Sequence, residues 1–565
     1  MPPGRRAAST FAEEVKNGPG LADFIRSSSA APSSASSSAT TTAADVELDL
    51  PSSFPRHLLD QSENTPKRKV FMETYGCQMN SSDSEIVMSI MQKAGYEETA
   101  ALDDADIIFV NTCAIRDNAE RKVWDRLNHF KNMKRANKQS KRVVGVLGCM
   151  AERLKSRLLE SDKLVDLVVG PDAYRSLPSL LTEVESGQTA MNVQLSMEET
   201  YADIRPVRTT SNNLSAYLSI MRGCNNMCSY CIVPFTRGRE RSRPIASILD
   251  EVRQLSDQGV KEVVLLGQNV NSYNDLSEQT FPVSDPTQLL SKGFGSMVKP
   301  NPGGVRFTQL MDQVSRIDPE MRVRFTSPHP KDFPDDLLHL IAERPNLCNA
   351  VHIPAQSGNS EVLHNMRRFY TREAYLELIQ RMREVIPNVG LSSDFISGFC
   401  GETEEHHQDT LSLLREVRFD QAFMFAYSMR EKTNAHRTLQ DNVPEEVKQQ
   451  RLKEVIQTFF ATLAEKSREE IGRRHLVLVE GTSRRSSDDL MGRTDNNKKV
   501  VFPNMKVDAE YGGATTGGAA AKVEVRPGDY VVVEVESTTG ITLLGRPLAR
   551  TTLSRFAQQG AVASC

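Results

Sequence analysis

Residues 222–231 read Arg222-Gly223-Cys224-Asn225-Asn226-Met227-Cys228-Ser229-Tyr230-Cys231. The C-x3-C-x2-C spacing places three thiols in one short loop, where they can bind three irons of a four-iron, four-sulfur cluster. Such clusters usually take four cysteines, so a trio leaves one iron open to another ligand. The alternative is a structural zinc loop, but zinc sites usually pair two such units, and no second unit lies nearby.

A second set of three cysteines, Cys77, Cys113 and Cys149, shares one local pattern. Each follows a strand-like run and precedes a helix-like segment, which indicates parallel βα units. The carboxyl ends of parallel strands lie at one edge of a sheet, so we expect these thiols to converge. The alternative is three separate core thiols. A disulfide framework is disfavoured because three is an odd number.

Strands and helices continue to alternate after the cysteine loop. Between Leu214 and Gln457 we count six strand-like runs separated by helix-like segments. This pattern predicts a partial (βα)6, TIM-like barrel with its chemistry at the carboxyl ends of the strands. The runs are Ala216–Met221, Glu262–Leu266, Val323–Thr326, Ala350–Pro354, Val389–Phe395 and Phe423–Tyr427.

The predicted fold class is α/β and multi-domain, as 565 residues exceed one ordinary domain. A net charge of −4 gives no global sign of nucleic-acid binding, and no apolar run approaches the roughly 20 residues of a membrane span. We expect a tail (1–66, either disordered or a mitochondrial transit peptide), an open α/β domain (67–187), a linker (188–213), the barrel (214–466) with a surface insertion (274–304), a small OB-like β-barrel (467–549) and a second tail (550–565).

The cysteine loop resembles that of the radical S-adenosylmethionine (SAM) enzymes. Tyr75–Asn80, Asn111–Cys113 and Gly148–Met150 resemble the methylthiotransferases within that superfamily, and the resemblance covers about residues 67–549. It implies that the loop holds a 4Fe–4S cluster whose open iron binds SAM, and that the final β-barrel is a TRAM domain that binds RNA. The ligands that it implies are Cys224, Cys228 and Cys231 for this cluster, and Cys77, Cys113 and Cys149 for an auxiliary 4Fe–4S cluster.

Further motifs favour the MiaB group, which acts on N6-isopentenyladenosine at position 37 of tRNA, beside the anticodon. They are Cys231–Pro244, Gly267–Asn271 and Arg324–Pro330, while Phe425–Thr433 resembles the eukaryotic branch of that group. Members of the branch act in mitochondria, with the cytoplasm as the alternative location. Two other substrates remain open within the family, namely threonylcarbamoyladenosine in tRNA and a ribosomal-protein aspartate.

The resemblance implies two roles for SAM. One molecule methylates a sulfide on the auxiliary cluster, and another is cleaved to a 5′-deoxyadenosyl radical that removes hydrogen from C2 of the adenine. The product is 2-methylthio-N6-isopentenyladenosine. An electron donor and a sulfur donor are further expected partners. The name of the branch refers to a kinase activator, so the alternative is a kinase-regulatory binding protein, although no kinase-docking feature is visible in the sequence.

Polar residues at the ends of the predicted strands are candidates for binding SAM, because they can meet its ribose hydroxyls and carboxylate. The alternative for most of them is ordinary turn chemistry. The candidates are Gln268 and Asn269 after the second strand, and Ser393, Asp394, Gly398 and Glu402 around the end of the fifth. Tyr230, between the last two cysteines of the loop, is a further candidate, because the resemblance implies an aromatic side chain near the SAM adenine at that place.

Four arginines follow the cysteine loop closely: Arg237, Arg239, Arg241 and Arg243. Guanidinium groups pair with phosphate in a bidentate fork, so this run is a candidate RNA contact beside the reaction site. A charge run is more commonly a solvated face, and that alternative stays open at this point.

Overall fold

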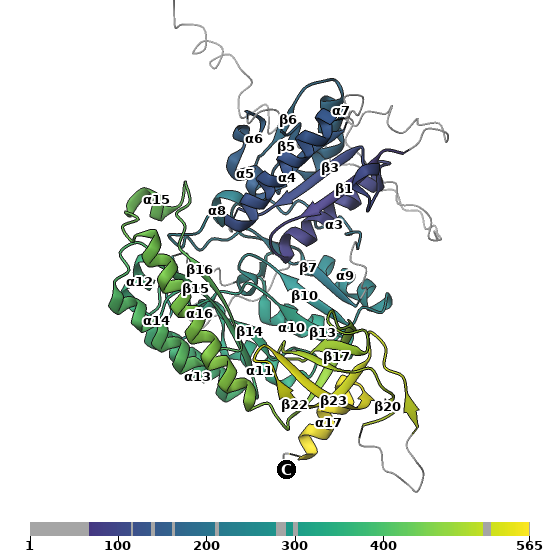
Figure 1. The fold of residues 1–565 in the computed structure, drawn as a ribbon, viewed down its shortest axis with the longest axis vertical. Coiled ribbons are helices and arrows are strands. Elements are labelled where there is room, and N and C mark those ends of the chain that lie inside the picture. Colours follow the sequence, from purple (N-terminus) through teal and green to yellow (C-terminus); the bar gives the residue numbers. More distant parts are fainter. Residues whose placement is uncertain are drawn as a thin grey trace, which may run out of the picture. The chain divides into compact units, whose positions relative to one another are not determined.

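The computed structural model describes residues 67–114, 117–136, 142–160, 164–208, 214–277, 290–297, 303–511 and 521–563. The predicted tail at 1–66 lies outside these ranges, and so do parts of the predicted linker and insertion. The described residues pack as one unit. The α/β multi-domain fold class is confirmed: an open parallel sheet, a partial barrel of parallel strands and a C-terminal β-barrel follow one another along the chain (Figure 1).

The first of these parts is a parallel sheet with helices on both faces. Its strands are β1 (Lys69–Thr74), β2 (Glu97–Glu98), β3 (Ile107–Thr112), β4 (Val143–Gly148), β5 (Leu167–Val169) and β6 (Ala190–Asn192), in the spatial order β2-β1-β3-β4-β5-β6. Helices α3 (Gln78–Lys93) and α7 (Leu177–Glu185) pack on one face, and α4 (Asp117–Ala136), α5 (Cys149–Leu154) and α6 (Ser156–Glu160) on the other. Both faces are covered, which explains the continuous apolar runs of β3 and β4.

The second part contains six parallel strands in two groups of three. One group is β7 (Ser215–Ser219), β10 (Glu262–Leu266) and β13 (Arg322–Phe325), and the other is β14 (Ala350–His352), β15 (Gly390–Ser397) and β16 (Gln421–Ala426). A parallel bridge between Val323 and Leu347 links them, so the strands follow one another in chain order as a partial (βα)6 barrel does. Each of the six strands lies within two residues of its predicted bounds.

Helices cover the outer face of these strands and enclose the largest apolar core of the described residues. Figure 1 shows α13, α14 and α16 along β14–β16. The helices of this part are α8 (Val233–Thr236), α9 (Ile245–Asp257), α10 (Phe307–Ser315), α11 (Asp335–Glu343), α12 (Ser360–Asn365), α13 (Arg372–Val385), α14 (Glu404–Val417), α15 (Asn434–Thr438) and α16 (Glu445–Arg468).

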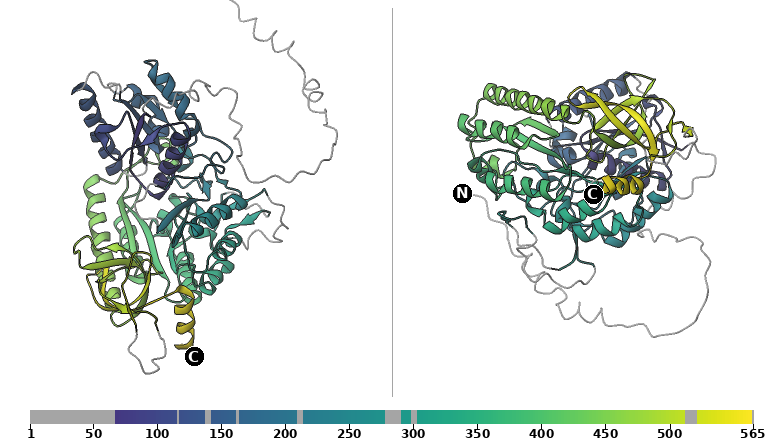
Figure 2. Two further views of the ribbon diagram at one scale, coloured as in Figure 1. Left: turned by 90° about the vertical axis from the view of Figure 1, so that its right-hand side faces the viewer. Right: turned by 90° about the horizontal axis from the view of Figure 1, so that it is seen from below.

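The third part is a β-barrel closed by pairing of β19 with β23 (Figure 2). Its strands are β17 (Arg474–Thr482), β18 (Asp489–Arg493), β19 (Lys499–Pro503), β20 (Val507–Asp508), β21 (Lys522–Val523), β22 (Tyr530–Thr538) and β23 (Thr542–Thr551). Helix α17 (Leu553–Ala563) follows, where the sequence predicted only a tail. Its first residue, Leu553, is buried against the strands, so two or three apolar side chains suffice to dock this helix.

Two short antiparallel pairs refine the predicted insertion and the cysteine loop. β11 (Asn274–Asp275) pairs with β12 (Val305–Arg306) and closes the base of the predicted insertion, whose residues 278–289 and 298–302 lie outside the described ranges. β8 (Met221–Arg222) pairs with β9 (Arg241–Ser242) and brackets the cysteine loop. Among the described residues, no helix is both long and apolar enough to cross a membrane.

Candidate functional site

The cysteine loop begins at a glycine that no other residue can replace without strain. Gly223 has φ +76°, and a Cβ built on it would lie 2.0 Å from the carbonyl oxygen of Arg239. The segment that contains Arg239 also holds the loop by a hydrogen bond, because Cys224 N–H donates to the Gly238 carbonyl at 3.2 Å. The β8–β9 pair thus folds residues 223–231 back against residues 238–241.

The three thiols of this loop lie in one another's electrostatic field. Cys224 and Cys228 are 9% and 8% exposed. Burial, followed by the neighbouring cysteines, raises the pKa of Cys224, and burial together with Cys228 raises the pKa of Cys231 to about 12. Three thiolates at this position therefore require positive charge between them, which is what a metal group supplies.

The second trio converges at one edge of the N-terminal sheet, as the strand-end pattern predicts. Cys77 precedes α3, Cys113 follows β3, and Cys149 begins α5 directly after β4. A Cβ built on Gly76 would lie 2.6 Å from Cys113 Cβ, which shows how closely the ends of β1 and β3 approach. Burial raises the pKa of Cys149, Arg237 lowers it and Cys77 raises it further, so these thiols also share one local field.

The two trios lie next to each other across the junction between the sheet and the partial barrel. Ile232, which follows Cys231, packs in one cluster with Cys149 and Ala114. On the other side Cys77 and Met79 pack against the strand residues Val264 and Leu266. Helix α5 also contacts α8. Groups bound by the two trios would therefore lie close to each other.

The spacing of the sulfur atoms distinguishes a cluster from a single ion. In the part of the chain that the structure describes, neither trio brings its three sulfurs within 4.8 Å of one another, the spacing at which side chains can share one ion. In a four-iron cluster each cysteine binds a different iron, so wider spacing is expected. The six cysteines form no disulfides. The assignment of 4Fe–4S groups to the two trios stays a prediction.

Three of the residues predicted to bind SAM border the cysteine loop. Gln268 accepts a hydrogen bond from Gly223 N–H. Asn269 is 2% exposed, and its Oδ1 has no hydrogen-bond partner among the described residues. Tyr230 lies beside Cys231 and Cys228, and burial raises the pKa of its hydroxyl well above the usual value. A buried acceptor without a partner is what a ligand-binding position offers.

The remaining four predicted residues lie within β15, as Ser393 and Asp394 do, or just after it, as Gly398 and Glu402 do. The Ser393 hydroxyl accepts from Ala355 N–H at 3.0 Å and donates to the Ile353 carbonyl at 2.8 Å, so its hydrogen bonds are used within the fold. Glu402 likewise accepts from Gly398 N–H at 2.9 Å and pairs with Arg451 at 3.1 Å. Contact with SAM through these groups stays a prediction, because Ser393, Gly398 and Glu402 already make hydrogen bonds within the fold.

Asp394 points to the opposite face of β15 from Ser393. It is only partly buried, and His352 Nε2 lies 3.3 Å from its Oδ2. Neighbouring Phe423 and Phe425 of β16 pair in register with Asp394 and Ile396 and are 39% and 37% exposed. This face, away from the helices, is the inner side of the partial barrel.

The arginine run is not an exposed basic patch, which corrects the interpretation of it as an RNA surface. Only Arg239 is exposed. A buried charge needs a partner, so the other three arginines form ion pairs that stabilise the fold. RNA contact stays a prediction for Arg239 alone. The exposed fractions of Arg237, Arg241 and Arg243 are 3%, 6% and 9%. Their ion-pair partners are Asp83, Asp172 and Glu251, respectively.

Sequence reasoning missed two charged residues at the site. Asp83 of α3 is fully buried between Arg222 and Arg237. Arg368 donates from Nη1 to Cys228 Sγ at 3.5 Å, and its guanidinium lies 5.4 Å from the ring centre of Tyr370. A charge among the buried residues of α3 could have indicated an ion pair, but one sequence does not identify the partner.

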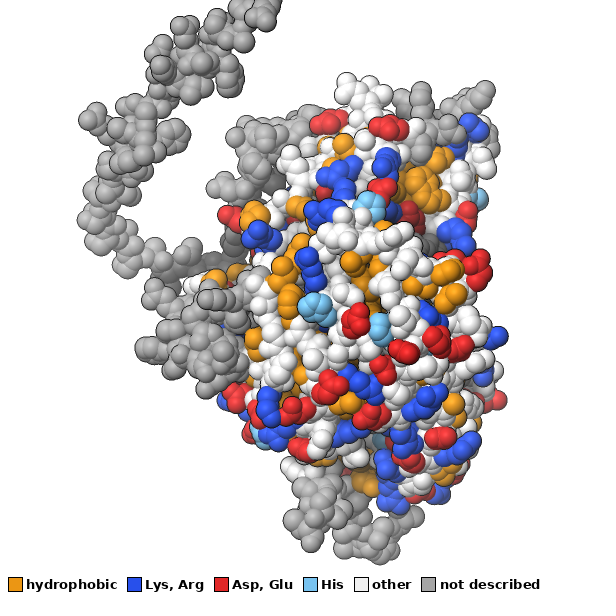
Figure 3. Space-filling view, turned by 90° about the vertical axis from the view of Figure 1, so that its left-hand side faces the viewer, with side chains coloured by type: hydrophobic (Ala, Val, Ile, Leu, Met, Phe, Trp, Pro, Cys, Tyr) orange, Lys and Arg blue, Asp and Glu red, His pale blue; other side chains and the backbone are white. Residues whose placement is uncertain are grey.

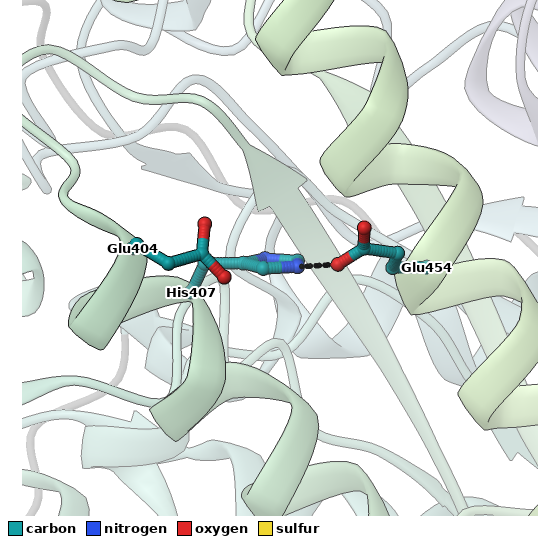
Figure 4. Close-up of side chains that lie close together, drawn as sticks. All are labelled: Glu404, His407 and Glu454. Carbon is teal, nitrogen blue, oxygen red and sulfur yellow. Dashed lines mark hydrogen bonds and ion pairs between the residues drawn. The ribbon is translucent and has the colours of Figure 1, made fainter.

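On the face in Figure 3, Lys and Arg side chains are interspersed with Asp and Glu rather than gathered into a basic patch. A second group of potential metal ligands, Glu404 and His407 of α14 with Glu454 of α16, lies on the outer helices (Figure 4). His407 is 2.8 Å from Glu454, and Arg451 is 3.6 Å from Glu404. The guanidinium already supplies positive charge, so we interpret this group as an ion-pair link between helices.

Three family models match the three parts of the chain. Residues 69–170 match "Uncharacterized protein family UPF0004", residues 218–414 match "Radical SAM superfamily", and residues 468–548 match "TRAM domain".

Full-length relatives give the most informative comparison. The chain is 55% identical over 546 residues to "Mitochondrial tRNA methylthiotransferase CDK5RAP1" of Rattus norvegicus, covering 96% of this chain and 90% of the relative. It is 51% identical over 482 residues to "tRNA-2-methylthio-N(6)-dimethylallyladenosine synthase" of Chloroherpeton thalassium, covering 85% and 96%. The solved radical SAM methyltransferase TsrM of Kitasatospora setae is 15% identical over 64% of this chain and 75% of its own, with a TM-score of 0.44, which is too low to carry an argument.

Proposed function

Since this chain belongs to the radical SAM tRNA methylthiotransferase family, we propose that it converts N6-isopentenyladenosine at position 37 of tRNA to the 2-methylthio derivative. The single observation that carries the proposal is the juxtaposition of two cysteine trios outside any disulfide, with Ile232 and Cys149 in one apolar cluster. A methylthiolation needs a sulfur group and a reactive site close to one target carbon. The threonylcarbamoyl and aspartate alternatives have no observation in their favour.

We assign one 4Fe–4S cluster to Cys224, Cys228 and Cys231, and a second to Cys77, Cys113 and Cys149. When bound, these groups would supply the electron that cleaves SAM and the sulfur that is transferred. The protein positions them, since Gly223 sets the loop and the edges of β1, β3 and β4 set the other trio. An electron donor is therefore a required partner, and a sulfur donor is the second that we propose.

Binding of SAM falls to residues along the loop and the inner strand ends. Tyr230, Asn269 and Asp394 are the positions we propose, because each offers a polar group beside the cysteine loop or on the inner face of the barrel. Gln268 supports them indirectly by holding Gly223. Apolar packing by Met79, Val264 and Leu266 next to Cys77 keeps water from this region, which protects a radical reaction.

RNA contact is proposed for the TRAM barrel, Arg239 and the inner aromatic face of β16. The target adenine lies in an anticodon loop, where a base can leave its stack at lower cost than in a paired helix. Exposed rings such as Phe423 and Phe425 are suited to stacking against a base. Because the relatives named mitochondrial cover nearly the whole chain, we propose a mitochondrial location.

The proposal is tested with anaerobically reconstituted full-length protein, SAM, a reductant and tRNA that carries N6-isopentenyladenosine. Mass spectrometry of the digested nucleosides should show the 2-methylthio product. Unmodified tRNA and tRNA that carries threonylcarbamoyladenosine serve as controls. Product formed only from the threonylcarbamoyl substrate, or no product from either, would contradict the proposal.

A further inference from the structure

A buried carboxylate joins the two sides of the site in a way that the proposed function leaves unexplained. Asp83 is fully buried on α3 and lies between two arginines that flank the cysteine loop. Its Oδ1 is 2.8 Å from Arg222 Nη1, and its Oδ2 is 2.7 Å from Arg237 Nη2. We call Asp83, Arg222 and Arg237 the Asp83 bridge. Asp83 belongs to the N-terminal sheet and both arginines to the partial barrel.

Arg237 extends from this bridge to a cysteine of the other part. Its Nε lies 3.1 Å from Cys149 Sγ and donates a hydrogen bond to it, while Nη2 donates to Asn80 Oδ1 at 3.1 Å. The side chain is 3% exposed. Its Nη1 is buried and has no hydrogen-bond partner among the residues that the structure describes. The Nε edge of the guanidinium is thus directed at Cys149 of the auxiliary site.

The two arginines differ in their charged neighbours. Arg222 and Arg237 share Asp83, and Glu199 lies 3.8 Å from Arg222 Nε. Arg222 also stacks on Tyr201, with its guanidinium 4.7 Å from the ring centre. Arg237 has one carboxylate neighbour, Asp83, and its other side-chain contacts are with Asn80 Oδ1 and the Cys149 sulfur. A thiolate that carries a cluster supplies negative charge at this point.

We propose that Arg237 is a positioning residue which the radical SAM part contributes to the auxiliary site. Its hydrogen bond to Cys149 Sγ raises the reduction potential of the cluster held there, and its bond to Asp83 holds the two cysteine sites at a constant separation. Hydrogen bonds to cluster sulfurs are known determinants of potential. This inference rests on the proposed function, since it takes Cys149 as a cluster ligand.

The test isolates the auxiliary cluster. In full-length protein with Cys224→Ala, Cys228→Ala and Cys231→Ala, only the Cys77, Cys113 and Cys149 site can bind iron. We compare this background with and without Arg237→Gln, measuring iron content, the electron paramagnetic resonance spectrum and the midpoint potential. The matched control is Arg253→Gln, which breaks an exposed arginine–aspartate pair with Asp250 on α9. Arg237→Gln should keep the iron, lower the potential and change the spectrum.

Two further measurements complete the test. Arg237→Lys keeps the positive charge but loses the two-pronged guanidinium, so it should shift the midpoint potential in the same direction by less. If Arg237→Gln does not fold, Arg237→Lys is compared with the background instead. With all six cysteines present, Arg237→Gln should still form 5′-deoxyadenosine while methylthiolated product falls about tenfold or more. If Arg237→Gln gave the same midpoint potential and spectrum as Arg253→Gln, the inference would be overturned. Absence of iron already in the unsubstituted background would instead refute the proposed cluster site.

Discussion

Gly223 decides the geometry of the first cysteine trio at the scale of a single residue. Its positive φ and the 2.0 Å approach of its built Cβ to the Arg239 carbonyl leave no room for a side chain. We predict that Gly223→Ala displaces the loop, so that iron bound after reconstitution falls from about eight to about four per chain. Measuring iron and SAM cleavage together checks this, because cleavage should be lost with the iron.

The control for this prediction separates steric conflict from backbone strain. Gly259 has φ +79°, but a Cβ built there meets nothing within 4 Å. Gly259→Ala should cost about 1–2 kcal/mol of stability and leave iron binding unchanged. Equal iron in both variants would show that the loop does not depend on close packing at Gly223.

Residue positions were predictable where they follow from strand ends and motif spacing. The convergence of Cys77, Cys113 and Cys149 follows from the common edge of a parallel sheet. The burial of Arg237 was not predictable, because its partner Asp83 is distant in sequence. From sequence alone, a charged residue is expected to be exposed unless its ion-pair partner is known. Such partners are brought together only by the fold.

At the scale of elements, β16 shows how a strand divides its two faces between core and function. Ala422 and Met424 pack against the core, whereas Phe423 and Phe425 are exposed on the inner face. We predict that Phe423→Ala and Phe425→Ala raise the KM for tRNA by about 5- to 100-fold, since stacking on one base contributes about 1–3 kcal/mol. SAM cleavage and iron content should not change. Steady-state kinetics with isopentenylated tRNA measures the effect.

Phe460 provides the matched control for these substitutions. It is 43% exposed but lies on α16, one of the helices on the outer face of the strands. Phe460→Ala should leave the KM for tRNA unchanged. An increase as large as that of Phe423→Ala would mean that loss of any exposed ring, rather than this face, weakens RNA binding.

Elements were predictable to the extent that their pattern is local. All six barrel strands lie within two residues of their predicted bounds, because each is a short strand-like run between helix-like segments. The pair β8–β9 was missed, since two-residue strands are set by tertiary hydrogen bonds. Helix α17 was missed for a related reason: it is stabilised by docking of Leu553 rather than by a long amphipathic repeat.

At the scale of the whole molecule, the C-terminal barrel is joined to the partial barrel through buried ion pairs. Glu262 of β10 lies 2.6 Å from Arg324 and 2.7 Å from Arg493 of β18. Arg324 also donates to the carbonyls of Thr494 and Asp495. Removing residues 468–565 would therefore leave buried charges without partners, so truncation is a poor test of RNA binding.

The stability of this junction should fall at acid pH. Burial alone would raise the pKa of Glu262, but the charges of Arg324 and Arg493 outweigh it and lower the pKa from 4.5 to about 2. A carboxyl whose pKa is depressed in the folded state stabilises the protein at pH values above its unfolded-state pKa. This contribution is lost as the pH falls from 4.5 towards 2. We predict that Glu262→Gln destabilises the junction at pH 7 by about 3–5 kcal/mol.

The difference between wild type and Glu262→Gln should narrow as the pH is lowered from 7 to 3, because protonation of Glu262 mimics the substitution. Thermal unfolding followed at several pH values measures it. A difference that stays constant over this range would mean that Glu262 does not carry the pH dependence of the junction.

The central claim is that two neighbouring cysteine trios each hold a four-iron cluster, and iron analysis of anaerobically reconstituted protein tests it most directly. Wild type should bind about eight irons per chain. The variant with Cys77→Ala, Cys113→Ala and Cys149→Ala should bind about four and still cleave SAM, and the variant with Cys224→Ala, Cys228→Ala and Cys231→Ala should bind about four and cleave none. An unchanged iron content in the first variant, or only about four irons in wild type, would contradict the account.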